Sequence, residues 1–152
     1  MRTRRIARRV LPWVAGWLAA QGLLVLVGRL LARRLDEGDE STTGIRRVQL
    51  VGGLDLHPVN PALCRIRMDL VMAGAELDLT GIPGTSGIDV TVNALMSGVV
   101  IRVPADWRVW SRFRGIGALG TDHGVQRTRD EHGADLRVHG AALFGGIGVQ
   151  AG

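Results

Sequence analysis

The stretch Leu136–Val149, Leu-Arg-Val-His-Gly-Ala-Ala-Leu-Phe-Gly-Gly-Ile-Gly-Val, decides the fold, because earlier parts of the chain repeat its pattern. Apolar residues alternate with polar or small ones, and a period of two is typical of a β-strand with one buried face. After the Gly145-Gly146 pair the apolar positions change parity. The residues predicted to point inward are Val138, Ala142, Phe144, Ile147 and Val149.

Two earlier segments share this pattern. Cys64–Leu79 alternates as far as Gly74, Val90–Val103 alternates as far as Gly98, and each then changes parity. Because side chains alternate faces along a strand, a parity change requires an inserted residue, a bulge or a corner, and glycine turns there without steric cost. The predicted inward residues are Ile66, Met68, Leu70, Met72, Leu77 and Leu79 in one segment and Val90, Val92, Ala94, Met96, Val99, Ile101 and Val103 in the other.

The spacing of the glycines predicts further copies. Gly98 lies 24 residues after Gly74, and Gly146 lies 48 residues after Gly98, so a hidden unit is expected within Asp106–Val125. A weaker copy is Val48–Leu56. Repeats of roughly 20 to 30 residues are typical of stacked architectures. We therefore predict a mainly β fold, a single-domain stacked-strand β-solenoid or rack whose terminal unit is the C-terminal stretch. A rolled antiparallel sheet is the alternative.

The N-terminal part of the chain predicts a membrane anchor. Val10–Leu31 is almost wholly apolar and is long enough to cross a bilayer as one transmembrane α-helix. Trp13 and Trp17 would lie at one interface, Gln21 interrupts the apolar run, and Arg29 would snorkel at the other end. A cleaved signal peptide is the competing interpretation, although its apolar core is normally only about 7 to 15 residues long.

The chain is therefore expected to have three parts: residues 1–34 as basic N-terminus and transmembrane helix, 35–44 as a polar linker, and 45–152 as the β-rack domain. Arginines exceed acidic residues before the apolar run, which favours a single-pass protein of the cell membrane with its N-terminus inside and its β domain extracytoplasmic. Ala15 and Ala19 are small residues four apart that would let two helices approach, so a homo-oligomer stays open.

Composition excludes some classes of protein. A hydrophobic fraction of 46% in 152 residues is sufficient for a buried core, and the formal charge of +5 comes from arginines that cluster before the apolar run. That distribution indicates a membrane surface, the lipid bilayer, and not nucleic acid. Binding to nucleic acid remains an alternative that steep salt dependence would reveal. Cys64 is the only cysteine, which excludes an internal disulfide.

Val99–Val109, with the later stretch Leu136–Val149, resembles the C-terminal domain of LiaF-like proteins, the cell-wall-active antibiotic response family with a toast-rack-like β fold. The resemblance covers residues 45–150. It implies a membrane-attached bacterial protein, an interaction or regulatory component of envelope-stress signalling that contacts a sensor histidine kinase or another membrane protein. The family has no catalytic residues to carry over, so the resemblance implies neither an enzyme nor a cofactor.

Motifs that would carry chemistry are weak. The segment Gly115–Gly120 has the spacing of a dinucleotide-binding loop, but no helical pattern follows it, so it is interpreted as turn material of the rack. The acidic residues Asp69, Glu76 and Asp78 are expected on the solvated face. No catalytic, cofactor-binding or metal site is predicted, since the histidines show no paired metal-ligand spacing. These histidines are His57, His123, His132 and His139.

An aromatic and basic cluster is the most unusual feature of the domain. Such mixtures suit protein hot spots or lipid headgroups, and they also arise where aromatic residues pack at an edge between snorkelling arginines. The alternative to an anchored interaction protein is a secreted or soluble β domain, ligand-binding or hydrolytic, that signal cleavage releases. The candidate residues for partner or membrane contact are Trp107, Arg108, Trp110, Arg112, Phe113 and Arg114.

Overall fold

A computed structural model gives the fold of the β domain and part of the segment that precedes it. The predicted anchor residues Trp13, Trp17, Gln21 and Arg29 lie outside the residues that the structure describes. Within the described part, no helix combines the length and the apolar character needed to cross a bilayer. The described residues are 22–23, 25–28, 30, 34–83 and 87–152.

The described residues form one parallel sheet. Its order is β1-β3-β5-β9-β6-β4-β2, with β7 on β9 and β8 on β7, and all these pairs are parallel. The predicted mainly β, stacked-strand fold is confirmed, and the rolled antiparallel alternative is wrong. The strands are β1 (Gly44–Gln49), β2 (Gly52–Leu56), β3 (Arg65–Val71), β4 (Ala73–Asp78), β5 (Ile88–Leu95), β6 (Gly98–Val103), β7 (Arg108–Thr121), β8 (Gln126–Arg127) and β9 (Leu136–Ala151).

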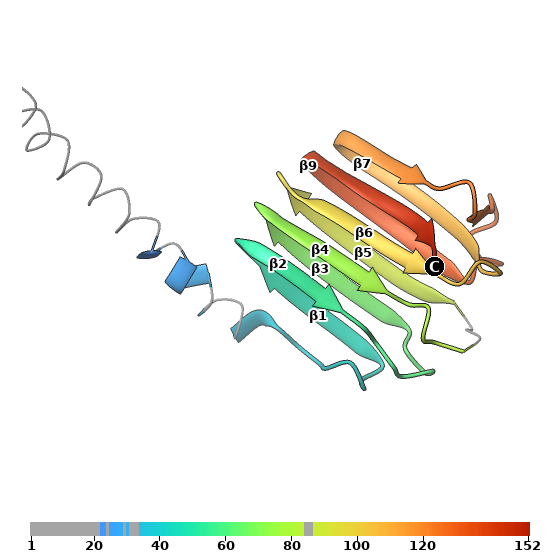
Figure 1. The fold of residues 1–152 in the computed structure, drawn as a ribbon, viewed down its shortest axis with the longest axis horizontal. Coiled ribbons are helices and arrows are strands. Elements are labelled where there is room, and N and C mark those ends of the chain that lie inside the picture. The colour runs from blue at the N-terminus through green and yellow to red at the C-terminus, as the bar shows by residue number, and fades with distance from the viewer. Residues whose placement is uncertain (1–21, 24, 29, 31–33, 84–86) are drawn as a thin grey trace, which may run out of the picture.

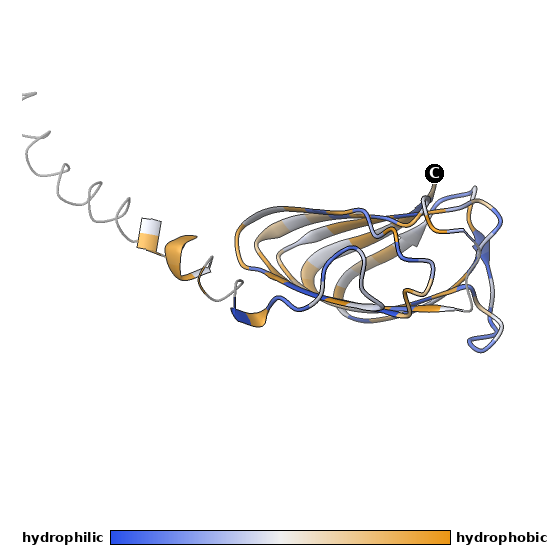
Figure 2. Cartoon of the chain, turned by 90° about the horizontal axis from the view of Figure 1, so that it is seen from below, coloured by the Kyte–Doolittle hydropathy of each residue, from blue (hydrophilic) through white to orange (hydrophobic). Residues whose placement is uncertain are grey.

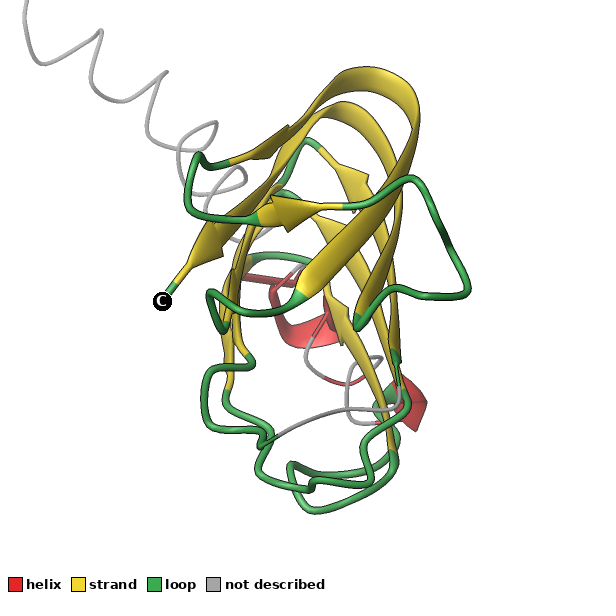
Figure 3. Cartoon of the chain, turned by 90° about the vertical axis from the view of Figure 1, so that its right-hand side faces the viewer, coloured by secondary structure: helices red, strands yellow, loops and turns green. Residues whose placement is uncertain are grey.

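Each repeat of the sequence is one extended segment that bends in the middle, and we call it a rung. β1 with β2, β3 with β4, and β5 with β6 are the two halves of a rung, whereas β7 and β9 each run through their bend as one strand. First halves pair with first halves and second halves with second halves, so the stack has two layers. Figure 3 shows the layers joined at the bends, with the loops at the opposite end.

The bends correct the prediction for three side chains. Met72, Met96 and Phe144 were expected to point inward, but they are 58%, 57% and 66% exposed and have φ of 49°, 50° and 56°. Each of these three bends has two consecutive outward residues, one of them in the left-handed conformation, and this pair changes the parity. The glycines that follow two residues later do not have positive φ. At these three bends the corner therefore lies at a methionine or a phenylalanine, whereas in the first rung and in β7 the residues with positive φ are glycines.

The order of the rungs in space differs from their order in the sequence. The hidden unit within Asp106–Val125 is confirmed as β7, and the weaker copy in Val48–Leu56 contributes to the first rung, β1 with β2. β9, however, lies between β5 with β6 on one side and β7 on the other. The C-terminal stretch Leu136–Val149 is thus not the terminal rung, and β7 occupies the end of the stack (Figure 1).

The core lies between the two layers, because every rung sends inward residues from both of its halves. Burial of a large aliphatic side chain stabilises a fold by about 1.5–3 kcal/mol, so these residues dominate the stability of the stack. The inward residues predicted from the alternation are buried except at the bends, whereas Ile82, Ile88 and Leu136 are core residues that the alternation did not predict. The most deeply buried are Ile66, Met68, Leu70, Leu77, Leu79, Ile82, Ile88, Ile101, Leu136, Val90, Val92 and Val103.

The two ends of the stack are finished differently. Residues of the predicted linker lie along β1: Glu37 forms an antiparallel bridge with Arg46, and the Val48 N–H donates to the Asp36 carboxylate at 2.8 Å. The Arg47 guanidinium also donates to the Gly38 carbonyl oxygen at 2.9 Å. At the other end, β7 carries only the short β8, which pairs with its first two residues. Beyond those residues, no other described strand covers the outer edge of β7.

Candidate interaction surface

In-register pairing arranges the outward side chains of β5, β9 and β7 in rows across the first layer. Residues at equivalent positions of parallel strands are direct neighbours, so each row holds one residue from each strand. From the loop end to the bend, the rows are Asp89, Arg137, Trp110; Thr91, His139, Arg112; Asn93, Ala141, Arg114; and Leu95, Leu143, Ile116.

The row nearest the loops is internally paired. The Arg137 guanidinium donates to both carboxylate oxygens of Asp89, at 2.6 and 2.9 Å. This bidentate bond holds the pKa of Asp89 below its usual range and raises the pKa of Arg137. The Trp110 ring contacts the His139 ring from the next row, with centroids 5.2 Å apart and planes tilted by 59°. These groups fasten neighbouring rungs together and are not free for a ligand.

Arg112 and Arg114 differ from the other arginines of this face. Both are exposed, and among the described residues neither lies within ion-pair distance of a carboxylate. With His139 they line a shallow depression of about 230 Å³ on the surface of β5, β9 and β7. Arg114 also lines the adjoining depression, which includes Leu95 and Leu143. The two cations therefore stand beside an apolar surface.

The predicted aromatic and basic cluster is divided by strand alternation. Trp107 is 4% exposed and belongs to the core, and Phe113 is partly buried against it. Arg108 pairs with Asp135, its Nε 3.3 Å from Oδ2. Edge packing thus accounts for Trp107 and Phe113, and an ion pair holds Arg108. Alternation places Arg108, Trp110, Arg112 and Arg114 on the same outer face of β7.

A row of exposed apolar side chains lines the bends, and our sequence reasoning missed it. Figure 2 shows the bends, at the end that faces the helical segment, coloured as hydrophobic, and the far loops as largely hydrophilic. Every bend except that of β7 has two adjacent apolar residues shortly before a glycine, which is the signal that would have identified them. We call this set the bend row; its members, each at least 39% exposed, are Val51, Met72, Leu95, Met96, Ile116, Leu143 and Phe144.

The second layer has a stripe of glycines beside the bends. Gly53, Gly74, Gly98 and Gly146 are in register across β2, β4, β6 and β9. A Cβ added to any of the first three would meet no heavy atom within 4 Å. Packing within the described chain therefore does not require glycine there, and the stripe lines a shallow depression of about 580 Å³ on the outer surface.

Gly115 and Gly117, by contrast, are required by close approach. Their φ values are 119° and 153°, and a Cβ on them would collide with the carbonyl oxygens of Ala142 and Gly145. The register between β7 and β9 shifts here, so that Phe144 has no partner on β7. The segment with dinucleotide-loop spacing is therefore a bend of the rack, as interpreted from the sequence.

The acidic residues do not converge. Asp69 is on β3 in the first layer, whereas Glu76 and Asp78 are on β4 in the second. Burial alone would raise the pKa of Asp69, but hydrogen bonds from Asn93 and Arg67 hold it below its usual range. Within the described ranges, no three His, Cys, Asp or Glu side chains gather in a way that could hold a metal ion.

The described helical residues lie at the same end of the stack as the bend row. An added Cβ on Gly28 would lie 3.3 Å from the Cβ of Leu50, which is at the bend of the first rung. Along this segment Leu23, Leu26 and Leu30 are 62%, 56% and 54% exposed.

Comparison of the chain with family models, with curated proteins and with solved structures finds no match.

Proposed function

We propose that this protein is a non-enzymatic, membrane-anchored β-rack that acts as an interaction or regulatory component of bacterial envelope-stress signalling. The observation that carries the proposal is the helical segment, which exposes Leu23, Leu26 and Leu30 and meets the domain at the bend of its first rung. Apolar side chains exposed along one helix are stable in a hydrocarbon environment, which fits a single-pass anchor in the cell membrane.

The open end of the stack is the surface that suits a protein partner. Beyond its first two residues, β7 has an outer edge that none of the described strands covers, and such an edge can accept a strand from another chain. At the opposite end of the stack, the edge of β1 is occupied by the segment that contains Glu37, and β2 pairs only with β4. A sensor histidine kinase or another membrane protein is the partner class that the family resemblance implies.

Cell fractionation tests the anchor. The full chain is expected to remain in the membrane fraction after high-salt and carbonate washes, and protease added to intact cells is expected to digest an extracytoplasmic β domain. A mature chain that has lost roughly thirty N-terminal residues and leaves the membrane fraction would contradict the proposal, because it would show signal cleavage.

Crosslinking tests the partner surface. A photo-crosslinking residue in place of Ala118, which is exposed on β7, is expected to capture a membrane protein in intact cells. The matched control carries the same residue in place of Asp39, which is exposed in the segment along β1 at the opposite end of the stack. Equal adducts from both positions, or none from Ala118, would count against a partner at the β7 edge.

A further inference from the structure

We infer that the bend edge of the stack is a lipid-contacting surface: the bend row enters the membrane interface, and Arg112 and Arg114 bind phosphate groups of anionic lipids. This inference rests on the proposed membrane anchor, which would hold the domain close to a bilayer. It adds a second contact with the membrane, made by the folded domain itself.

The depth of the charges matches a bilayer interface. Successive outward residues of a strand are about 6.6 Å apart, so on β7 Arg114 lies about 7 Å and Arg112 about 13 Å behind Ile116. An interfacial element buries its apolar face about 5–10 Å into the boundary between headgroups and acyl chains. With the bend row at that depth, both guanidinium groups reach the level of the lipid phosphates.

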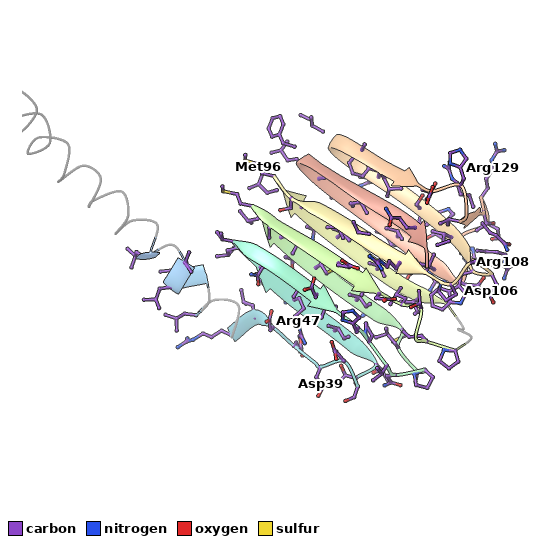
Figure 4. All side chains as sticks on the ribbon, in the orientation of Figure 1. Asp39, Arg47, Met96, Asp106, Arg108 and Arg129 are labelled. Carbon is purple, nitrogen blue, oxygen red and sulfur yellow. The ribbon has the colours of Figure 1, made fainter. Side chains whose placement is uncertain are left out.

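The orientation of the domain agrees with this depth. The contact between Gly28 and Leu50 brings the helical segment to the bend edge, and Figure 1 shows the coloured residues of that segment beyond the bends. Figure 4 shows Met96 at this end and Asp106 and Arg129 at the opposite one. The domain therefore presents its apolar edge toward the anchor and its charged loops away from it.

Backbone strain indicates that the apolar side chains of the bend row have a function of their own. Met72, Met96 and Phe144 adopt φ near 50°, a conformation in which glycine and asparagine are less strained than large side chains. Each of these side chains is more than half exposed, so it adds little to the core. A large apolar residue at a strained, solvent-facing corner is explained by a surface that covers it.

Charge complementarity selects an anionic lipid as the occupant. The nearby carboxylates are already paired, Asp89 with Arg137 and Asp69 with Arg67, while Arg112 and Arg114 have no carboxylate partner among the described residues. A guanidinium donates two parallel hydrogen bonds to a phosphate. Acyl chains would cover the adjoining Leu95, Leu143 and Ile116.

The test uses the full chain reconstituted in phosphatidylcholine vesicles, with or without phosphatidylglycerol. A fluorophore is attached to a Met96→Cys, Cys64→Ser variant, and the control carries it on the native Cys64, which is exposed just before β3 and therefore at the loop end. We expect nitroxide-labelled lipids to quench the bend label and not the loop label. A Met72→Cys, Cys64→Ser variant repeats the measurement at a second corner.

The charge is tested with matched double variants. Each arginine near an anionic surface changes binding about fivefold. The double variant Arg112→Gln, Arg114→Gln is therefore expected to lower, roughly 25-fold, the ratio of molecules whose bend edge contacts the membrane to those whose bend edge does not, in phosphatidylglycerol vesicles. Arg127→Gln with Arg129→Gln removes the same charge from exposed residues at the loop end and is expected to leave the ratio unchanged.

The outcomes separate the two proposals. If the full chain does not float with the vesicles, the anchor fails. If it floats and the bend labels are not quenched, the lipid-contacting edge is overturned, and energy transfer between labels on two copies would then assign the edge to a dimer. Two results would overturn the assignment of the phosphates to lipid. One is an equal loss of membrane contact from both pairs of arginine substitutions. The other is reversal of the phosphatidylglycerol effect by inorganic phosphate but not by sodium chloride of equal ionic strength.

Discussion

Phe144 is the residue at which the alternation of the C-terminal strand breaks. The side chain is 66% exposed and its φ is 56°, a conformation that Asp and Asn tolerate better than Phe. An inward Phe144 would make Phe144→Asp unfold the domain, and the outward position of the side chain removes the basis for that expectation. The reason is that two consecutive residues, Leu143 and Phe144, face outward at the bend.

We predict that Phe144→Asp changes the free energy of unfolding by less than about 0.5 kcal/mol, as for most exposed sites. Val138→Asp in the same strand is expected to cost at least about 4 kcal/mol, because Val138 is 0% exposed and the charge would have no partner. Urea denaturation of both variants checks the contrast. Similar losses of stability in both would mean that Phe144 is buried after all.

Glycines in the bends are expected to divide into two classes. Gly98→Ala should raise the free energy of unfolding by about 0.4–1 kcal/mol, because the site is open and alanine restricts the unfolded chain. Gly117→Ala should lower the free energy of unfolding by about 1–3 kcal/mol, because alanine is strained in this backbone conformation. The collision with the Gly145 carbonyl should lower it further. Thermal melts measure both. Destabilisation by Gly98→Ala would show that something packs against the glycine stripe.

The Asp89–Arg137 pair should make stability depend on pH. The hydrogen bond from Arg137 lowers the pKa of Asp89 in the folded chain below its ordinary value of 3.8. The pair therefore stabilises the fold above that value, and this contribution is lost as pH falls through the lower, folded pKa. Because the groups are partly exposed, Asp89→Asn is expected to cost no more than about 1 kcal/mol at pH 7.

That cost should be smaller near pH 2, because protonation of Asp89, as the pH falls through its lowered pKa, removes the same charge that the substitution removes. Urea denaturation of the parent and variant at both pH values measures the difference, with Asp106→Asn, an exposed loop substitution, as the control. A cost that is the same at both pH values would rule out an electrostatic origin.

At the scale of elements, the two long strands have unequal neighbours. β9 pairs with β5 and β6 on one edge and with β7 on the other, whereas β7 has β9 on one edge and only the short β8 on the other. Amides in a strand that is paired on both edges exchange slowly, since exchange requires the stack to open.

We therefore predict that the amides of β9 are the most protected in the chain and that those of β7 alternate between protected and fast-exchanging. Hydrogen exchange followed by NMR, in the folded protein at neutral pH, resolves individual amides. The amides of β5, which also lies between two strands, are the internal control. Uniform protection along β7 would show that its outer edge is covered.

At the scale of the whole molecule, the last strand of the sequence lies in the interior of the stack. β9 separates the rung of β5 and β6 from the rung of β7, so β7 can join the sheet only through β9. The stack is therefore completed only after the C-terminal residues are available. Contacts between distant parts of the chain, which are slow to form, dominate the end of the stack that carries β7.

A chain truncated after Asp135 is expected to lose its cooperative thermal transition. Without β9, the apolar inner faces of β5 and β6 lie at an open end, and β7 has no strand to pair with except β8. Far-UV circular dichroism during heating measures the loss. A truncated chain that melts with the sharpness of the full chain would contradict the inserted position of β9.

The sequence by itself determined the stacked rungs and the inward residues of each straight segment, including Ile66, Val92 and Val149. This was possible because the alternation of faces is a local property of an extended chain. The doubled glycine interval also located β7, although its own glycines blur the alternation. Of the candidate contact residues, alternation alone would have separated the inward Phe113 from the outward Arg112 and Arg114.

Only the tertiary structure decided which residues turn at the bends and where β9 lies. Two strands meet at each bend, and their alternations disagree about Met72, Met96 and Phe144. The alternation of the strand before the bend places these side chains inward, and that of the strand after it places them outward. Pairing with the neighbouring rung decides between the two. The position of β9 depends on hydrogen bonds between segments far apart in the sequence, which no local pattern encodes. The bend row and its distance from Arg112 and Arg114 follow from that pairing, because strand register aligns residues of different rungs.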